Sequence, residues 1–140
     1  ALAVPVTAAG ELIMVRQYRF ALMGRLLEFP AGTIEAEEAP VDTIRREIQE
    51  EIGYTAQTWL PIGNFPLAPG YSDEIIYAFL ATDLEPIESP PEADADEDIE
   101  VVLFTPVQLE KAILAGEAVD AKSIASFYLV KPYLEKLAAL

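Results

Sequence analysis

Three glutamates at helical spacing are the residues of this chain that are best placed to do chemistry. Glu47, Glu50 and Glu51 lie in the segment RREIQEEIG, at positions i, i+3 and i+4. At about 100° per residue in an α-helix, their side chains fall within an arc of about 100°. Like charges at this spacing cost roughly 0.2–0.5 kcal/mol per pair in an isolated helix. The segment is therefore either a solvated acidic face or a set of oxygen ligands for divalent cations.

A helix from about Pro40 to Ile52 must position these carboxylates. Proline is favoured in the first helical turn, and Gly53 suits the left-handed residue that follows a helix. An apolar stripe at helical spacing adjoins the glutamates and is expected to pack on a sheet. Because the acids abut this stripe instead of lying opposite it, the pattern favours the ligand set. The stripe consists of Val41, Ile44, Ile48 and Ile52.

The rest of the chain has the pattern of alternating strands and helices. Apolar segments at 2–7 and 12–18 predict a hairpin, and 24–32 predicts a short strand that enters a Pro/Gly loop. We find no repeat and no linker, so we expect one α/β domain over residues 1–140, with mixed strands and helices on both faces. Further strands are expected at 59–67, 75–81 and 101–104, the last of them buried, and further helices at 106–115 and 121–137, with Pro132 as a kink or break in the second.

Composition limits the classes of function. The 140 residues are 52% hydrophobic, with a mean hydropathy of +0.24, as in a folded globular chain. There is no cysteine, which excludes disulfides and thiolate metal sites and favours a reducing compartment, the cytoplasm. There is no histidine either, so a general base must be a carboxylate, a lysine or a tyrosine. No apolar run approaches the roughly 20 residues of a membrane span, and no targeting peptide is visible.

The formal net charge of −15 also restricts the partners. An acidic surface repels phosphate backbones, so we expect no nucleic-acid partner. The same charge would repel a small phosphorylated substrate, unless divalent cations bind the carboxylates first and the phosphate then binds the cations. Phosphate chemistry in this chain is thus expected to require a metal.

The segment from Gly32 to Tyr54 resembles the Nudix box. It reads Gly32, five residues, Glu38, seven residues, Arg46-Glu47-Ile48, one residue, Glu50-Glu51, one residue, Gly53-Tyr54. Tyr54 departs from the usual aliphatic residue, which is a packing change. The resemblance implies an α/β/α sandwich with a mixed sheet that binds Mg²⁺ or Mn²⁺ and hydrolyses a nucleoside diphosphate linked to another moiety.

The resemblance also implies roles for individual residues of the box. Arg46 would orient the glutamates, which fits its position four residues before Glu50, and Glu38 would lie further from the ions. Glu50 and Glu51 would take part in catalysis as well as in metal binding. The implied metal ligands are Glu47, Glu50, Glu51 and the backbone carbonyl of Ala31.

Three further segments resemble the ADP-ribose pyrophosphatase group of this family. They are VRQYR before the box, LEFPAG at its start and APGYSDE after it, with Pro69 fifteen residues past Tyr54. The C-terminal segments EDIEVV and LAGEAVDAKSIASFYL are similar to the same group, so the likeness extends from Val4 to about Leu134. It implies cleavage of ADP-ribose to AMP and ribose 5-phosphate.

Substrate-binding roles have alternatives. Arg19 would hold a substrate phosphate, or it is a surface arginine at a strand end. Glu28 would contact the nucleoside, or it caps the loop. Glu74 resembles a glutamate that supports the phosphate site. Gly70, with Pro69, shapes a turn that lines the pocket.

A catalytic base is expected in the acidic loop PEADADEDIE. The resemblance favours Glu97, as base or additional metal ligand, with Asp96, Asp94 and Glu92 as alternatives. A solvated loop without a catalytic role is the other interpretation. A calcium loop is disfavoured, because the sixth position lacks glycine and the twelfth lacks glutamate.

Members of the group usually carry an N-terminal β segment that is exchanged between subunits and helps to enclose the adenine. This chain is expected to start after that segment, and base specificity and the expected homodimer both depend on the segment. Four aromatic residues are candidates to stack on a base, although most aromatics at such spacings belong to a core. They are Tyr18, Phe20, Phe65 and Tyr71.

Three classes of function compete. The first is a hydrolase of ADP-ribose or of another nucleoside diphosphate sugar such as GDP-mannose. The second is a non-catalytic Nudix-like domain that senses a nucleotide. The third is an acidic domain that buffers metal ions. The complete set of box glutamates favours the first.

Overall fold

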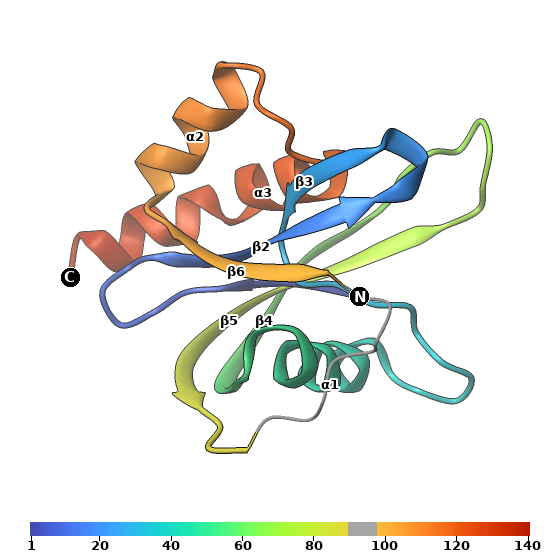
Figure 1. The fold of residues 1–140 in the computed structure, drawn as a ribbon. Helices are drawn as coiled ribbons and strands as arrows, with labels where there is room; N and C mark the ends of the chain where they lie inside the picture. The colour runs from blue at the N-terminus through green and yellow to red at the C-terminus, as the bar shows by residue number, and fades with distance from the viewer. Residues whose placement is uncertain (90–97) are drawn as a thin grey trace.

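The computed structural model describes residues 1–89 and 98–140. Strands lie in the middle of the molecule, with helix α1 on one side of them and helices α2 and α3 on the other (Figure 1). This arrangement confirms the expected α/β/α sandwich. The elements are β1 (Leu2–Pro5), β2 (Leu12–Arg19), a 3-10 turn η1 (Phe20–Leu22), β3 (Gly24–Glu28), α1 (Pro40–Ile52), β4 (Tyr54–Pro66), β5 (Ile75–Pro86), β6 (Ile99–Phe104), α2 (Pro106–Leu114) and α3 (Ala121–Ala138).

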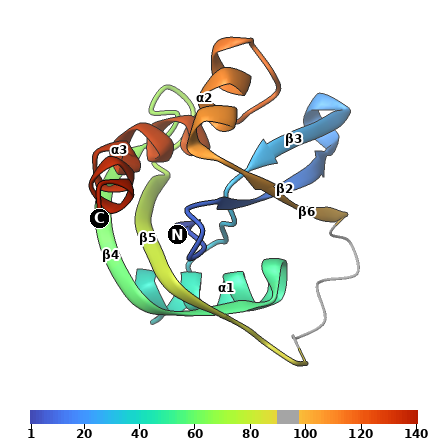
Figure 2. The same cartoon turned by 90° about the vertical axis from the view of Figure 1, so that its left-hand side faces the viewer.

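The strands form two three-stranded sheets, which Figure 2 shows side by side. One sheet has the order β1-β5-β4 and is mixed, because β1 runs parallel to β5 while β4 runs antiparallel to it. The other has the order β3-β2-β6 and is antiparallel. The mixed character was expected from the sequence; the division into two sheets was not.

Strands β1 and β2 are covered on both faces. On β2, Leu12 and Met14 pack into the core that contains Phe127 of α3, whereas Ile13 and Val15 pack into the core under α1. Strands buried on both sides read as continuous apolar runs, which is what these segments show. Strands β1 and β2 therefore contribute side chains to the core on the α3 side and to the core on the α1 side.

The structure corrects three expectations. Residues 2–7 and 12–18 do not form a paired hairpin. In this described part of the chain an isolated Val6–Leu12 bridge and two Thr7–Glu11 hydrogen bonds join them, because β1 pairs with β5 and β2 with β3 and β6. Strand β6 lies at a sheet edge, so Val101 and Leu103 are 46% and 53% exposed instead of buried. Helix α3 continues through Pro132 without a break.

Helix α1 has the expected bounds. It starts at Pro40 and ends at Ile52, and Gly53 adopts the left-handed conformation with φ 73°. Its residues Ile44, Ile48 and Ile52 are buried in the core beneath the sheets. None of the helices in the described ranges is long and apolar enough to cross a membrane.

Candidate functional site

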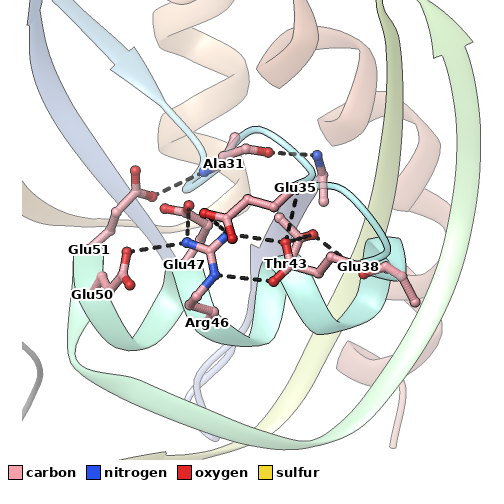
Figure 3. A network of polar contacts seen from close by, with 11 residues as sticks. Ala31, Glu35, Glu38, Thr43, Arg46, Glu47, Glu50 and Glu51 are labelled. Carbon is pink, nitrogen blue, oxygen red and sulfur yellow. Dashed lines mark hydrogen bonds and ion pairs between the residues drawn. The ribbon is translucent and has the colours of Figure 1, made fainter.

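Helix α1 buries two of the three candidate glutamates. Glu47 and Glu51 are 9% and 8% exposed, and Glu50 is half-buried. They leave the helix next to the apolar stripe, on the side that faces the loop after β3 (Figure 3). The interpretation that the acidic face of this helix is wholly solvated is therefore wrong.

The loop after β3 touches both buried glutamates. The backbone N–H of Ala31 donates to Glu51 Oε2 at 3.1 Å. At Gly32, a Cβ atom would lie 2.1 Å from Cδ of Glu47, so only glycine leaves room for that carboxylate over the loop. Two hydrogen bonds between Gly32 and Ala1, of 2.9 and 3.0 Å, fix the loop to the start of β1. Glycine at position 32 of the box is thus explained sterically, because a Cβ atom there would displace the Glu47 carboxylate.

Arg46 is surrounded by carboxylates. Its guanidinium donates to Glu38 at 3.2 and 3.3 Å and to Glu47 at 2.9 Å. It also lies 3.6 Å from Glu50, the contact expected from the i, i+4 spacing, and 3.8 Å from Glu35. We call these five residues the Arg46 cluster; Figure 3 shows them converging between α1 and the loop.

Glu38 is the best-anchored acid of the Arg46 cluster. Hydrogen bonds from Arg46 and from the Thr43 hydroxyl, the latter 2.5 Å long, lower its pKa to about 2. Thr43 and Glu35 were not predicted to belong to this network, although Thr43 lies in the first turn of α1, where a hydroxyl can reach back to the preceding loop.

The donor set of this region fits a hard cation, since it consists of carboxylate and backbone carbonyl oxygens. Within residues 1–89 and 98–140, however, no three acidic side chains stand close enough together to hold an ion as they lie. Glu47 and Glu50 lean towards Arg46, and Glu51 accepts from Ala31. A divalent ion at this site would therefore compete with Arg46 and with the loop for the same oxygens.

Arg19 and Glu28, two candidate substrate residues, bind each other. Arg19 Nε and Nη2 donate to the two carboxylate oxygens of Glu28, both at 2.8 Å. Glu28 is 2% exposed and also accepts from Lys122 Nζ at 2.7 Å. Lys122 forms a further ion pair with Asp120. We call these four residues the Glu28 cluster.

Glu28 is charged despite its burial. Burial raises the pKa of this carboxyl, but hydrogen bonds from Arg19 and Lys122 outweigh it and leave the pKa below its ordinary value. Lys122 was not predicted as a site residue from the sequence. The available signal was its place in the first turn of a helix after Asp120, whose side chain accepts from the N–H of Ser123 as a helix cap.

The other predicted residues belong to neither cluster or are not described, although Glu74 lies within electrostatic reach of the Ala1 ammonium that donates to Gly32. Gly70 and Glu74 are exposed in the turn between β4 and β5, and the N–H of Glu74 donates to Ser72. Tyr71 is exposed, while Phe65 packs against the core. Glu97 and its alternatives, Asp96, Asp94 and Glu92, lie outside the described residues.

Comparison with known proteins adds a family and two relatives. A family model of the NUDIX domain matches residues 1–127. The chain is 42% identical to an ADP-ribose pyrophosphatase of Bacillus subtilis (strain 168) over 118 residues, which cover 84% of this chain and 64% of that relative. It is 35% identical to an ADP-ribose pyrophosphatase of Mycobacterium tuberculosis (strain ATCC 25618 / H37Rv), covering 86% of this chain and 59% of that relative.

The fold is similar to that of a crystal structure of an ADP compounds hydrolase. The TM-score is 0.87, with 23% sequence identity, and the match covers 99% of this chain and 74% of that chain. At this identity the likeness concerns the fold alone. The chain spans less than two thirds of the length of the two pyrophosphatases it matches.

Proposed function

This chain belongs to the NUDIX family, and from that premise we propose that it is a metal-dependent pyrophosphohydrolase that cleaves ADP-ribose to AMP and ribose 5-phosphate. The similarity to two ADP-ribose pyrophosphatases, at 42% and 35% identity, supports the choice of substrate. Complete box glutamates support hydrolysis over simple binding.

The packing of Glu47 and Glu51 supports this proposal most directly. Burying carboxylates is costly unless they are paired, hydrogen-bonded or bound to a metal. Here the chain buries two of them against Ala31 and Gly32, and among the described residues four carboxylates, those of Glu35, Glu38, Glu47 and Glu50, lie within ion-pair distance of the one guanidinium of Arg46. Such an excess of negative charge at one place is suited to a divalent cation.

The residues of the chain have distinct tasks in the proposed reaction. Glu47, Glu50, Glu51 and the Ala31 carbonyl would hold Mg²⁺ or Mn²⁺, which supplies Lewis acidity and charge neutralisation for attack of water on a phosphorus atom. Arg46 orients the glutamates, and Arg19 binds a phosphate oxygen. The general base is a carboxylate, for which Glu97 remains the prediction, with Asp96, Asp94 and Glu92 as the alternatives.

The test is hydrolysis of ADP-ribose in ¹⁸O-labelled water, with and without Mg²⁺, followed by mass spectrometry of the products. We expect AMP and ribose 5-phosphate only with the metal. Label in ribose 5-phosphate would indicate attack on the phosphorus nearer that ribose, and label in AMP the other one. If ADP-ribose survives, the substrate assignment is wrong.

Parallel assays separate the alternatives. Cleavage of GDP-mannose but not of ADP-ribose would identify a different nucleoside diphosphate sugar hydrolase. Tight binding of ADP-ribose without products would indicate a nucleotide sensor. We also propose a cytoplasmic homodimer, which light scattering of the purified chain and fractionation of cells test directly.

A further inference from the structure

The Glu28 cluster connects the start of α3 to the candidate site. Besides the Lys122–Glu28 contact, the N–H of Leu27 donates to Ala118 at 2.8 Å, and that of Asp120 donates back to Leu27 at 3.4 Å. These contacts attach the end of β3 to the segment that opens α3. The cluster is therefore part of a built junction and is not a set of chance surface pairs.

The residue after Glu28 is attached to the same helix. The N–H of Phe29 donates to the buried Ser123 hydroxyl at 2.8 Å. Glu28 thus lies between Leu27, whose backbone is bonded to the residues just before α3, and Phe29, whose N–H is bonded to α3 itself, and the Glu28 carboxylate is held by Lys122. Its position leaves little freedom to the side chain.

Arg19 depends on that carboxylate for its orientation. Glu28 occupies the edge of the guanidinium formed by Nε and Nη2, at 2.8 Å for both atoms. In this side-on geometry the other edge, formed by the two terminal nitrogens, points away from Glu28. The Arg19 side chain is 43% exposed, so it is open to an anion from solvent.

Arg19 also lies within electrostatic reach of Glu51 on α1. Its pKa is raised chiefly by the hydrogen bond to Glu28, and the Glu51 carboxylate adds to the rise. A guanidinium beside an acidic metal site is well placed for a diphosphate, because planar terminal nitrogens can hold two phosphate oxygens.

From these contacts we propose that Lys122 is a positioning residue for substrate binding. By holding buried Glu28 from the side of α3, it fixes the guanidinium of Arg19 so that the outer edge meets a phosphate oxygen of the substrate. This inference rests on the proposed function for the presence of a diphosphate, but it assigns Lys122 and the start of α3 a task that the box residues do not have. Lys122 itself does not touch substrate.

The first test compares Lys122→Met with Lys131→Met. Both residues lie on α3, and each substitution removes one positive charge. Lys131, however, lies further along the helix and pairs with Glu110 of α2. The probe is the methylene analogue of ADP with Mg²⁺, in which carbon replaces the bridging oxygen, so binding is measured by calorimetry without hydrolysis. We expect the Kd to rise about tenfold in K122M and to stay unchanged in K131M.

Kinetics with ADP-ribose give the second readout. We expect KM to rise about tenfold in K122M while kcat changes less than about threefold, because an anchor for bound phosphate is lost and the α1 glutamates are not. Lys122→Arg should restore most of the affinity, since it keeps the charge that holds Glu28. A merely structural role would lower the melting temperature without this division between KM and kcat.

The outcomes separate the inference from the proposed function. If the wild type does not hydrolyse ADP-ribose but K122M still weakens binding of the diphosphate probe, the substrate is wrong and the inference stands. If the wild type is active and folded K122M binds the probe as tightly as K131M does, the inference is overturned.

A double variant protects the test against misfolding. Should K122M not fold because Glu28 is left with one partner, Glu28→Gln/Lys122→Met removes both buried charges together. We expect this variant to fold and to bind the probe as weakly as proposed for K122M, because Arg19 has lost its support. Wild-type affinity in the folded double variant would contradict the role of Lys122.

Discussion

The Arg46 cluster and the Glu28 cluster both combine acids with cations near the loop after β3, but they differ in balance. In the Arg46 cluster four carboxylates share one guanidinium. In the Glu28 cluster two carboxylates face two cations. Buried charges that are fully paired hold elements in place, whereas an excess of one sign attracts an outside partner of the other sign. Charge balance therefore separates a junction from a candidate metal site.

The largest effect is expected for Glu51→Gln, in the region with excess acid. Glutamine can still accept from the Ala31 N–H, so the fold should persist. We expect turnover of ADP-ribose to fall on the order of 10²–10⁴-fold, as for loss of a catalytic carboxylate. Product release measured by chromatography tests this.

The control for that variant is Glu135→Gln. Glu135 is exposed on α3, and its replacement changes the net charge by the same amount. Full activity is expected in E135Q. Equal activity in E51Q and E135Q would contradict a catalytic role for Glu51 beside the Arg46 cluster.

A smaller loss of activity is expected for Gly32→Ala. The new Cβ would lie 2.1 Å from Glu47, so the carboxylate must leave its place over the loop. We expect a decrease of about tenfold to a hundredfold in kcat/KM. In Gly24→Ala the nearest atom is a backbone oxygen at 3.8 Å, so this matched variant should keep its activity.

Beside the Glu28 cluster, where the charges balance, the expected effect of a substitution is on the free energy of unfolding. Ser123→Ala leaves the buried N–H of Phe29 without its acceptor, which costs about 1–3 kcal/mol of unfolding free energy. Ser126 is equally buried on the same helix, but within the described residues its hydroxyl has no hydrogen-bond partner. Ser126→Ala should therefore be neutral or stabilising. Urea denaturation of both variants tests this contrast, and equal losses would contradict it.

The smallest effect concerns pH. Glu38 has a pKa of about 2 in the folded chain, against an ordinary value of 4.5, because Arg46 and Thr43 bind its charged form. A lowered pKa contributes stability that is complete above pH 4.5 and is lost as the pH falls towards 2. Glu38→Gln should therefore lose stability relative to the wild type above pH 4.5 and approach it below. Thermal melts from pH 2 to 6 measure the difference, and a constant gap over this range would refute the linkage.

The sequence predicted local features of the fold well. Helix α1 has the bounds and the left-handed Gly53 that proline, glycine and the apolar stripe indicated. Pairing was harder. The sequence signal for a turn near Gly10 is present, yet β1 continues into one sheet and β2 into the other, because burial of both strands on two faces outweighs the hairpin.

The same contrast holds for the candidate site: features within one segment were predicted from the sequence, and contacts between distant segments were not. Glu47, Glu50 and Glu51 were predicted to share one face from their helical spacing, since an α-helix fixes which side chains share a face, while their roles came from the resemblance to the Nudix box. Arg19 and Glu28 were also identified, but as separate candidates. Their contact with each other has no local signature, because they belong to neighbouring strands and their third partner, Lys122, lies more than ninety residues further along the chain.

By itself, then, the sequence determined the family, the acidic helix and the glycine loop that faces it, because all three are written in contiguous residues with fixed helical or turn geometry. Only the tertiary structure decided which charges balance each other. Which distant side chains pair depends on how α3 packs against β3, and no repeating pattern of residues in the sequence predicts that contact.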